Sequence, residues 1–161
     1  MCIRDRYKED DIPDAQDMYG ITKRLGEVDC INTITLRTSI IGHELNGNRS
    51  LINWFLSQEK EVKGFTRAIF SGLPTVEIAK IIRDFVLPNQ NLRGVYHLSA
   101  NPISKYDLLK LVAKVYQKDI KIIESNDCII DRSLDSSKFK KETGYNPKPW
   151  IELVQLMKEF G

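Results

Sequence analysis

The sequence has few cysteines, no long apolar run and no excess of charge of one sign. Its three cysteines, Cys2, Cys30 and Cys128, are odd in number and widely separated, which argues against both a disulfide framework and a zinc site. No apolar stretch approaches the ~20 residues that a membrane-spanning helix needs. The 24 basic and 22 acidic residues are mixed along the chain, so it offers no basic face for nucleic acid. We therefore expect a protein of a reducing cytoplasm that holds no metal and binds neither nucleic acid nor a membrane.

The sequence also lacks the glycine-rich turn that binds dinucleotides. No G-x-x-G-x-x-G spacing occurs among its nine glycines, although such a turn approaches the pyrophosphate in Rossmann folds. Residues 1–6 contain no apolar segment of a secretory signal. They join directly onto a polar run, residues 7–11, without a preceding strand or helix. We interpret residues 1–6 as a non-native leader and leave them out of the fold prediction.

What the sequence does contain is an alternation of strand-like and helix-like segments. Apolar, β-branched runs are separated by stretches of helical period and by Gly, Pro and Asn, which is typical of an α/β protein with a parallel sheet. The predicted strands cover residues 33–41, 94–98 and 120–123, and residues 62–70 are predicted to be extended or irregular. The predicted helices cover residues 17–30, 51–59, 75–88, 104–116 and 135–143, and a last helix follows Pro149.

Three of these helices carry recognisable start or stop signals. Thr75 is placed as an N-cap before an apolar stripe that ends at Pro88. Ser104 with Asp107 three residues on resembles a capping box. Gly144 is expected to end the helix over 135–143.

The feature that points to chemistry is the pair Tyr19 and Lys23 on the first predicted helix. Residues four apart lie on the same helix face, so the phenol and the ammonium can project into one site. A phenol, with a pKa near 10, is a poor general acid at neutral pH, and a neighbouring cation brings that pKa toward the working range. Taken alone, the pair is more simply two common residues on a solvated face, and the surrounding sequence decides against that interpretation.

Five segments occur in an order and at spacings that resemble the extended short-chain dehydrogenase/reductases, and most closely the dTDP-4-dehydrorhamnose reductases. The resemblance covers essentially all of residues 7–161. The segments are Tyr19-Gly20-Ile21-Thr22-Lys23-Arg24-Leu25-Gly26-Glu27, Leu36-Arg37-Thr38-Ser39-Ile40-Ile41-Gly42, Gly72-Leu73-Pro74-Thr75, Gly94-Val95-Tyr96-His97-Leu98-Ser99, and Arg132-Ser133-Leu134-Asp135-Ser136-Ser137-Lys138 with Thr143-Gly144-Tyr145 before Pro149-Trp150.

The resemblance implies an α/β fold made of part of an NAD(P)-binding Rossmann-like parallel sheet and a smaller α/β substrate domain. Residues 7–45 and 75–100 would form the latter half of the Rossmann-like domain. Residues 46–74 and 101–161 would form the sugar-nucleotide domain. On this interpretation the chain is a carboxyl-terminal fragment that lacks the amino-terminal cofactor-binding half, and we expect it to be inactive by itself.

The resemblance also implies roles for particular residues. Tyr19 would protonate the sugar carbonyl as hydride arrives from NADPH or NADH, and Lys23 would bind the nicotinamide ribose. The loop Thr38-Ser39-Ile40 would lie against the nicotinamide end of the coenzyme, just beyond the carboxyl end of a strand. Arg37 is also expected to contact the coenzyme. The implied activity is NAD(P)H-dependent reduction of a nucleotide-linked 4-keto-6-deoxy sugar for cell-surface polysaccharide.

Substrate contacts are expected from Ile40, His43 and Arg132. Arg132 is a candidate for bidentate hydrogen bonding to the substrate pyrophosphate, although an exposed loop arginine is the commoner outcome. The rhamnose-forming enzymes tend to carry Trp where this chain has Ile40, so another deoxy-ketosugar stays open. His97, on an apolar strand, is expected to be a core residue, as are Trp54 and Trp150 (large aromatics, which dominate core burial).

Other functions stay open at this point. A nucleotide-sugar epimerase or dehydratase of the same superfamily would share the Tyr19 and Lys23 pair. A non-catalytic subunit, similar to the regulatory subunit of methionine adenosyltransferase, would share the fold without the chemistry. A homodimer of the full-length protein also stays open.

Overall fold

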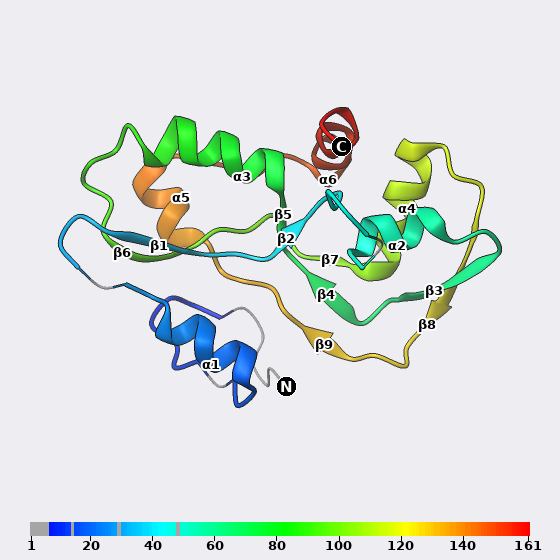
Figure 1. The fold of residues 1–161 in the computed structure, drawn as a ribbon, viewed down its shortest axis with the longest axis horizontal. Coiled ribbons are helices and arrows are strands. Elements are labelled where there is room, and N and C mark those ends of the chain that lie inside the picture. Colours follow the sequence, from blue (N-terminus) through cyan, green and yellow to red (C-terminus); the bar gives the residue numbers. More distant parts are fainter. Residues whose placement is uncertain (1–6, 14, 29, 48) are drawn as a thin grey trace.

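The computed structural model describes residues 7–13, 15–28, 30–47 and 49–161, so the interpretation of residues 1–6 as a leader lies outside the described residues. Helices and short strands alternate along the chain (Figure 1). The elements are α1 (Met18–Leu25), β1 (Ile34–Arg37), β2 (Ile40–Ile41), α2 (Leu51–Ser57), β3 (Glu61–Phe65), β4 (Ala68–Phe70), β5 (Leu73–Pro74), α3 (Thr75–Ile81), η1 (Ile82–Val86), β6 (Gly94–His97), β7 (Ile103–Ser104), α4 (Lys105–Tyr116), β8 (Lys121–Ser125), β9 (Ile130–Asp131), α5 (Ser137–Thr143) and α6 (Trp150–Glu159).

Most strand pairs are parallel. β1 pairs with β6, β2 with β5, β3 with β8 and β4 with β9, while β4 and β7 pair in the antiparallel sense. Parallel partners cannot be joined by a tight hairpin and need long crossovers. The segments that carry α2, α3 and α4 supply those connections, as the predicted α/β pattern requires.

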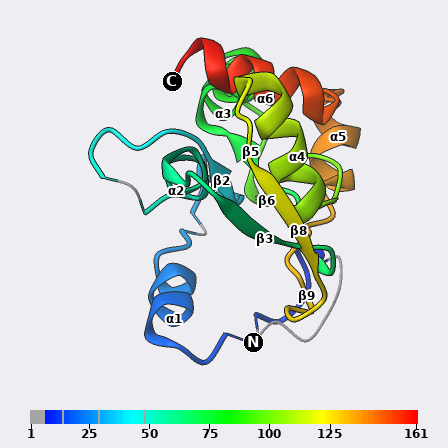
Figure 2. The same cartoon turned by 90° about the vertical axis from the view of Figure 1, so that its right-hand side faces the viewer.

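The core lies between α4, α6 and the strands beneath them (Figure 2). Leu108 of α4 and Leu153 of α6 are completely buried. The predicted capping box starts α4, because the Ser104 hydroxyl oxygen accepts from the Asp107 backbone N–H at 3.0 Å and donates to the Asp107 carboxylate at 2.6 Å. Gly144 ends α5 with a φ of 75°, in the left-handed region that glycine adopts without a steric penalty.

The predicted strand over 33–41 is wrong in its continuity. The strand is broken at Thr38 and Ser39, because β1 forms its hydrogen bonds with β6 whereas β2 forms its hydrogen bonds with β5. The predicted strand at 120–123 is confirmed as β8, and the extended segment 62–70 contains β3 and β4. The first helix is shorter than predicted and ends at Leu25.

The predicted helix over 75–88 has a different start and a different second half. Pro74, the last residue of β5, is its N-cap in extended geometry with φ −58° and ψ 142°, and Thr75 is already helical. From Ile82 the helix widens into the π-helical turn η1, in which the Leu87 N–H donates to the Ile82 carbonyl at 2.9 Å. Such turns occur mostly as single-turn bulges inside α-helices, frequently at functional sites.

The aromatic core predictions are confirmed for Trp150 and wrong for Trp54. Trp150 is 9% exposed and its indole N–H donates to the Asn101 carbonyl at 2.7 Å. Trp54 lies on α2 with 37% of its surface exposed, because the buried residues of that short helix are Ile52 and Phe55. His97 is buried, as predicted.

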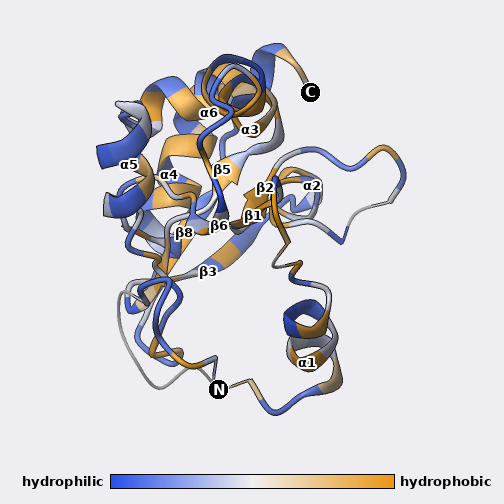
Figure 3. Cartoon of the chain, turned by 90° about the vertical axis from the view of Figure 1, so that its left-hand side faces the viewer, coloured by the Kyte–Doolittle hydropathy of each residue, from blue (hydrophilic) through white to orange (hydrophobic). Residues whose placement is uncertain are grey.

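Helix α1 stands apart from this core. It lies on the opposite side of β1 and β6 from α3, and the views in Figures 2 and 3 show it separated from the other helices. None of its residues, all of which the structure describes, is buried, and Met18 and Leu25 are 75% and 79% exposed. The predicted apolar stripe is present, and its side chains are exposed rather than buried against the core.

Candidate active site

The Tyr19 and Lys23 side chains meet on the surface of α1. The Lys23 Nζ atom lies 5.6 Å from the centroid of the Tyr19 ring, and Tyr19 is 74% exposed. The helix starts because the Asp17 carboxylate accepts from the Gly20 N–H at 2.8 Å, which satisfies one of the free amides of the first turn. A Cβ at Gly20 would collide with the Ala15 side chain, so glycine beside Tyr19 lets the preceding chain pass close to the helix.

Helix α1 is held by polar contacts at both of its ends rather than by its face. After the helix, the Glu27 carboxylate accepts two hydrogen bonds from the Arg37 guanidinium, at 2.6 Å from Nε and 2.8 Å from Nη2. The bonds to Arg37 lower the pKa of Glu27, and the same pairing raises the pKa of Arg37. This fork geometry fixes the position of both side chains as well as their charges.

Before the helix, the chain is attached to β6 through His97. The His97 backbone N–H donates to the Glu9 carboxylate at 2.8 Å, and its ring Nδ1 lies 2.9 Å from the Tyr7 carbonyl. Arg37 Nη1 lies 3.4 Å from His97 Nε2 and donates to the Glu9 carbonyl at 3.3 Å. These distances suit a neutral ring that donates from Nδ1 and accepts at Nε2. Burial lowers the pKa of His97, which favours this neutral form.

Arg37 therefore connects both anchors of α1. The sequence predicts that Arg37 contacts the coenzyme. In the structure its guanidinium already contacts Glu27, Glu9 and His97. Among the described residues, no hydrogen bond joins Arg37 to Tyr19 or Lys23.

Thr38 and Ser39 follow the carboxyl end of β1, and Ile40 is the first residue of β2. The Ser39 carbonyl accepts from the Leu73 N–H at 2.9 Å, and a Cβ at Gly72 would collide with that carbonyl. This close approach explains why a glycine precedes β5. Thr38 and Ser39 are half-buried, whereas Ile40 is 62% exposed.

The other predicted substrate residues lie elsewhere. His43 Nε2 is 2.7 Å from the Tyr116 hydroxyl of α4, and burial raises the pKa of Tyr116 to about 12. Arg132 is exposed on the segment after β9, where its backbone N–H donates to the Ile69 carbonyl at 3.1 Å. The structure thus brings Tyr19 and Lys23 together, while Ile40, His43 and Arg132 each contact a different element.

One polar residue outside these predictions is unusual. Glu77 of α3 is 3% exposed, and its Oε2 atom has no hydrogen-bond partner among the described residues. In the sequence, the only signal was a carboxylate among the apolar residues of the helix over 75–88.

The part of the chain that the structure describes contains no cluster of three or more His, Cys, Asp or Glu side chains arranged for a metal ion. None of the described helices has the length and apolar character that spanning a bilayer would need.

Comparison with known proteins identifies the fold. Neither protein-family models nor curated protein sequences give a match to this chain. Among solved structures, a hypothetical dTDP-4-dehydrorhamnose reductase from Sulfolobus tokodaii matches with a TM-score of 0.71 and 23% identity over 92% of this chain and 57% of that one. The dTDP-4-dehydrorhamnose reductase from Bacillus anthracis, solved with NADP, matches with a TM-score of 0.67 and 14% identity over 80% of this chain and 48% of that one. A dTDP-glucose 4,6-dehydratase from the same organism, solved with NAD, matches with a TM-score of 0.67 and 15% identity over 99% and 57%.

The chain thus spans about half the length of these structures. The likenesses confirm the predicted α/β, Rossmann-like fold class and the predicted similarity in fold to dTDP-4-dehydrorhamnose reductases. At these identities they concern the fold alone. The assignment of residue ranges to two domains and the roles of individual residues stay predictions.

Proposed function

We propose that this chain carries the catalytic helix of an NAD(P)H-dependent reductase that acts on a nucleotide-linked 4-keto-6-deoxy sugar. The observation that supports the proposal most directly is the pairing of an exposed phenol and an ammonium on α1, with Lys23 Nζ 5.6 Å from the Tyr19 ring. Fold likeness to reductases raises the expectation, but the chemistry must be argued from the side chains.

The exposed side chains of α1 suit the nicotinamide end of a dinucleotide. The Lys23 ammonium offers three N–H donors for ribose hydroxyls, and the Tyr19 hydroxyl can both donate and accept. Thr38 and Ser39 follow the carboxyl end of a parallel strand, which is where ligands bind in open α/β sheets. Residues 7–161 show no glycine-rich turn for the pyrophosphate, so we assign only this end of the coenzyme to the chain.

The bound coenzyme would supply a hydride to the carbonyl carbon of the sugar. Tyr19 then donates its hydroxyl proton to the carbonyl oxygen, so that the ketone becomes an alcohol. Lys23 stabilises the phenolate that remains, and the position of both groups on one helix face keeps them aligned during the transfer. Glu27 and Arg37 position α1 without taking part in the proton transfer.

Replacement of Tyr19 by Phe in the natural full-length protein that contains these residues tests this proposal. We expect kcat to fall by ~10²–10⁴, the usual contribution of a positioned general acid, with little change in coenzyme affinity. The measurement is NADPH oxidation with a dTDP-4-keto-6-deoxy sugar. Tyr106→Phe, on α4, is the matched control and should keep the parent rate.

Lys23→Met in the same protein should have two effects. Loss of the charge that stabilises the phenolate left after proton transfer should lower kcat. Loss of a charge-assisted hydrogen bond should weaken coenzyme binding, by about 1.5–3 kcal/mol. Arg24→Met, which removes a neighbouring cation of α1, is the control. If Lys23→Met kept the parent kcat and the parent coenzyme affinity, Lys23 would be a surface lysine with no part in the reaction.

A dehydratase is the main alternative, since one such enzyme has the same fold. A dehydratase eliminates water from its sugar without net consumption of NADPH, whereas a reductase consumes one coenzyme per ketone. With dTDP-glucose as the substrate, a 4-keto-6-deoxy product formed without NADPH oxidation would therefore replace the reductase proposal by a dehydratase. A reductase rate that is unchanged in Tyr19→Phe would remove Tyr19 from the chemistry, and the absence of any catalysis would favour a non-catalytic binding subunit.

A further inference from the structure

A small groove lies between α3 with its π-helical turn and the segment that joins α5 to α6. Its volume is about 190 Å³, enough for about six water molecules at ~30 Å³ each. The side chains that matter for its chemistry are Glu77, Lys80, Phe85, Tyr145, Asn146 and Lys148. We call this the Glu77 groove.

Glu77 is the buried polar group of the groove. Its Oε1 atom accepts from the Tyr145 hydroxyl at 3.3 Å, while Oε2 has no hydrogen-bond partner within the described residues and lies 3.8 Å from Lys148 Nζ. Burial and the neighbouring Glu77 raise the pKa of Tyr145, so this phenol remains a proton donor to Oε1. A carboxylate oxygen removed from water and left without a hydrogen-bond donor is costly, and Glu77 is one of the residues that line the groove.

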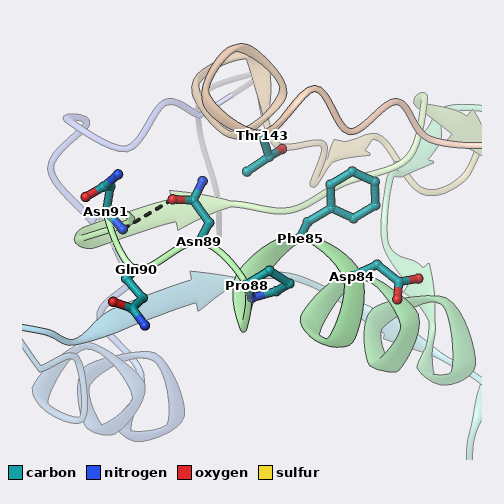
Figure 4. Close-up of a pocket in the computed structure, with 7 residues that line it drawn as sticks. All are labelled: Asp84, Phe85, Pro88, Asn89, Gln90, Asn91 and Thr143. Carbon is teal, nitrogen blue, oxygen red and sulfur yellow. Dashed lines mark hydrogen bonds between the residues drawn. The ribbon is translucent and has the colours of Figure 1, made fainter.

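The wall beside Glu77 combines apolar and polar surface. The Phe85 ring, on the π-helical turn, packs edge-on against Tyr145 with the ring centroids 5.4 Å apart. A second hollow, of about 450 Å³, has Phe85 in its wall and is otherwise lined mainly by polar side chains, among them Asn89, Gln90 and Asn91 (Figure 4). Asp84 and Phe85 line both cavities, so the two are neighbours at this turn.

The charges around the groove select among ligand classes. Lys80 and Lys148 at its rim disfavour an organic cation, and Glu77 and Asp84 disfavour an anion. A hydroxyl group suits both signs, because it donates to a carboxylate and accepts from an ammonium. Neighbouring hydroxyls on one ring could therefore contact Glu77 and Lys148 together, with the C–H face of the ring against Phe85.

We propose that the Glu77 groove binds a neutral polyhydroxylated ligand, a sugar or a cyclic polyol, through a hydroxyl that donates to Glu77 Oε2. This site is separate from the proposed reductase site, since α3 and α1 lie on opposite sides of β1 and β6 (Figure 1). Free sugar bound here would not reach Tyr19.

A titration of the 161-residue chain followed by ¹H–¹⁵N NMR tests the proposal on the unaltered protein. The probes are D-glucose, L-rhamnose and myo-inositol, with ethanolamine hydrochloride and inorganic phosphate as the charged comparisons. At least one neutral probe should shift the backbone amides of Glu77, Phe85 and Asn146 with a roughly millimolar Kd. If none of the three shifts these amides, or if ethanolamine or phosphate shifts them at lower concentration, the proposal is wrong.

Two variants assign the binding to the groove. Glu77→Gln and Lys148→Met should each weaken binding of the neutral probe about tenfold or more, because each removes a charged hydrogen-bond partner. The matched controls Glu59→Gln and Lys60→Met change the same residue types at exposed positions outside the groove and should bind like the parent. Because Lys148 is half-exposed, its variant decides the test even if Glu77→Gln unfolds. Parent-like affinity in Lys148→Met would overturn the proposal.

Discussion

Helices α1 and α4 begin in the same way but contribute differently to the molecule. Each has an N-cap side chain that accepts from the first turn, Asp17 in α1 and Ser104 in α4. Helix α4 buries Leu108, Leu109 and Val112, whereas none of the residues of α1, which the structure describes in full, is buried. Capping and periodicity thus decide where a helix forms, while burial decides how strongly that helix is coupled to the folding of the whole chain.

The largest difference in the free energy of unfolding is expected when one leucine in each helix is replaced by alanine. Leu108→Ala should lower the free energy of unfolding by about 2–5 kcal/mol, because its side chain is completely buried and its loss leaves a cavity. Leu25→Ala, at a position that is 79% exposed, should change it by less than about 0.5 kcal/mol. Urea denaturation of the 161-residue chain measures both. Equal losses would mean that α1 packs on the core in solution.

The next largest effect is expected from the ion pair of Glu27 and Arg37, which joins the end of α1 to β1. Glu27→Gln should cost about 1–3 kcal/mol, because it replaces a bidentate, charge-assisted contact and leaves the half-buried Arg37 without its anion. Glu59→Gln, which removes an exposed carboxylate, is the control for the loss of charge. A cost no greater than that of the control would show that α1 is not held through this ion pair.

Removal of the N-cap side chains should change the free energy of unfolding by a smaller amount. Ser104→Ala should lower the free energy of unfolding by about 1 kcal/mol, because α4 is part of the core. Asp17→Ala removes an equivalent bond from α1, yet it should leave the global unfolding transition unchanged and instead speed hydrogen exchange at the amides of α1. A global loss in Asp17→Ala would contradict the separation of the two regions.

Much of the fold could be predicted because it depends on short-range signals. The capping box of Ser104 and the left-handed Gly144 are local features, and both were correct. The break between β1 and β2 was not readable, because Thr38 and Ser39 look like strand residues and only the different partners β6 and β5 separate them. Likewise, the stripe on α1 predicts a helix but says nothing about what covers it.

In the candidate site, too, contacts between residues close in the sequence could be predicted, whereas contacts between distant residues could not. The approach of Lys23 to Tyr19 follows from their spacing on one helix, although their role in catalysis stays a prediction. The partners of Arg37 were not visible, since Glu27 and His97 are 10 and 60 residues away in the sequence. The buried oxygen of Glu77 depends on Tyr145 and Lys148, which reach it only after α5 and α6 have packed.

The smallest expected effect concerns His97, which attaches the segment before α1 to β6. The neutral ring donates to the Tyr7 carbonyl and faces Arg37 at Nε2. A proton added at Nε2 would lie against the guanidinium inside the protein, and burial accordingly holds the pKa of His97 below its usual 6.5, with Glu9 opposing the shift. Below about pH 6.5 the unfolded chain therefore binds more protons at this residue than the folded chain does. The free energy of unfolding should fall as the pH drops from there through the lowered pKa.

Urea denaturation between about pH 8 and about pH 5 measures this slope. The lowered pKa of Glu27 acts only below its usual value of 4.5, so its contribution falls outside this window. His97→Gln should flatten the slope, since it removes the titrating ring while an amide can still donate toward Tyr7. His43→Gln removes the other histidine of the chain and should keep the parent slope, because His97 is retained. If His97→Gln kept the slope and His43→Gln lost it, the pH dependence would belong to the contact between His43 and Tyr116, and the attachment of the segment before α1 would not depend on a neutral His97.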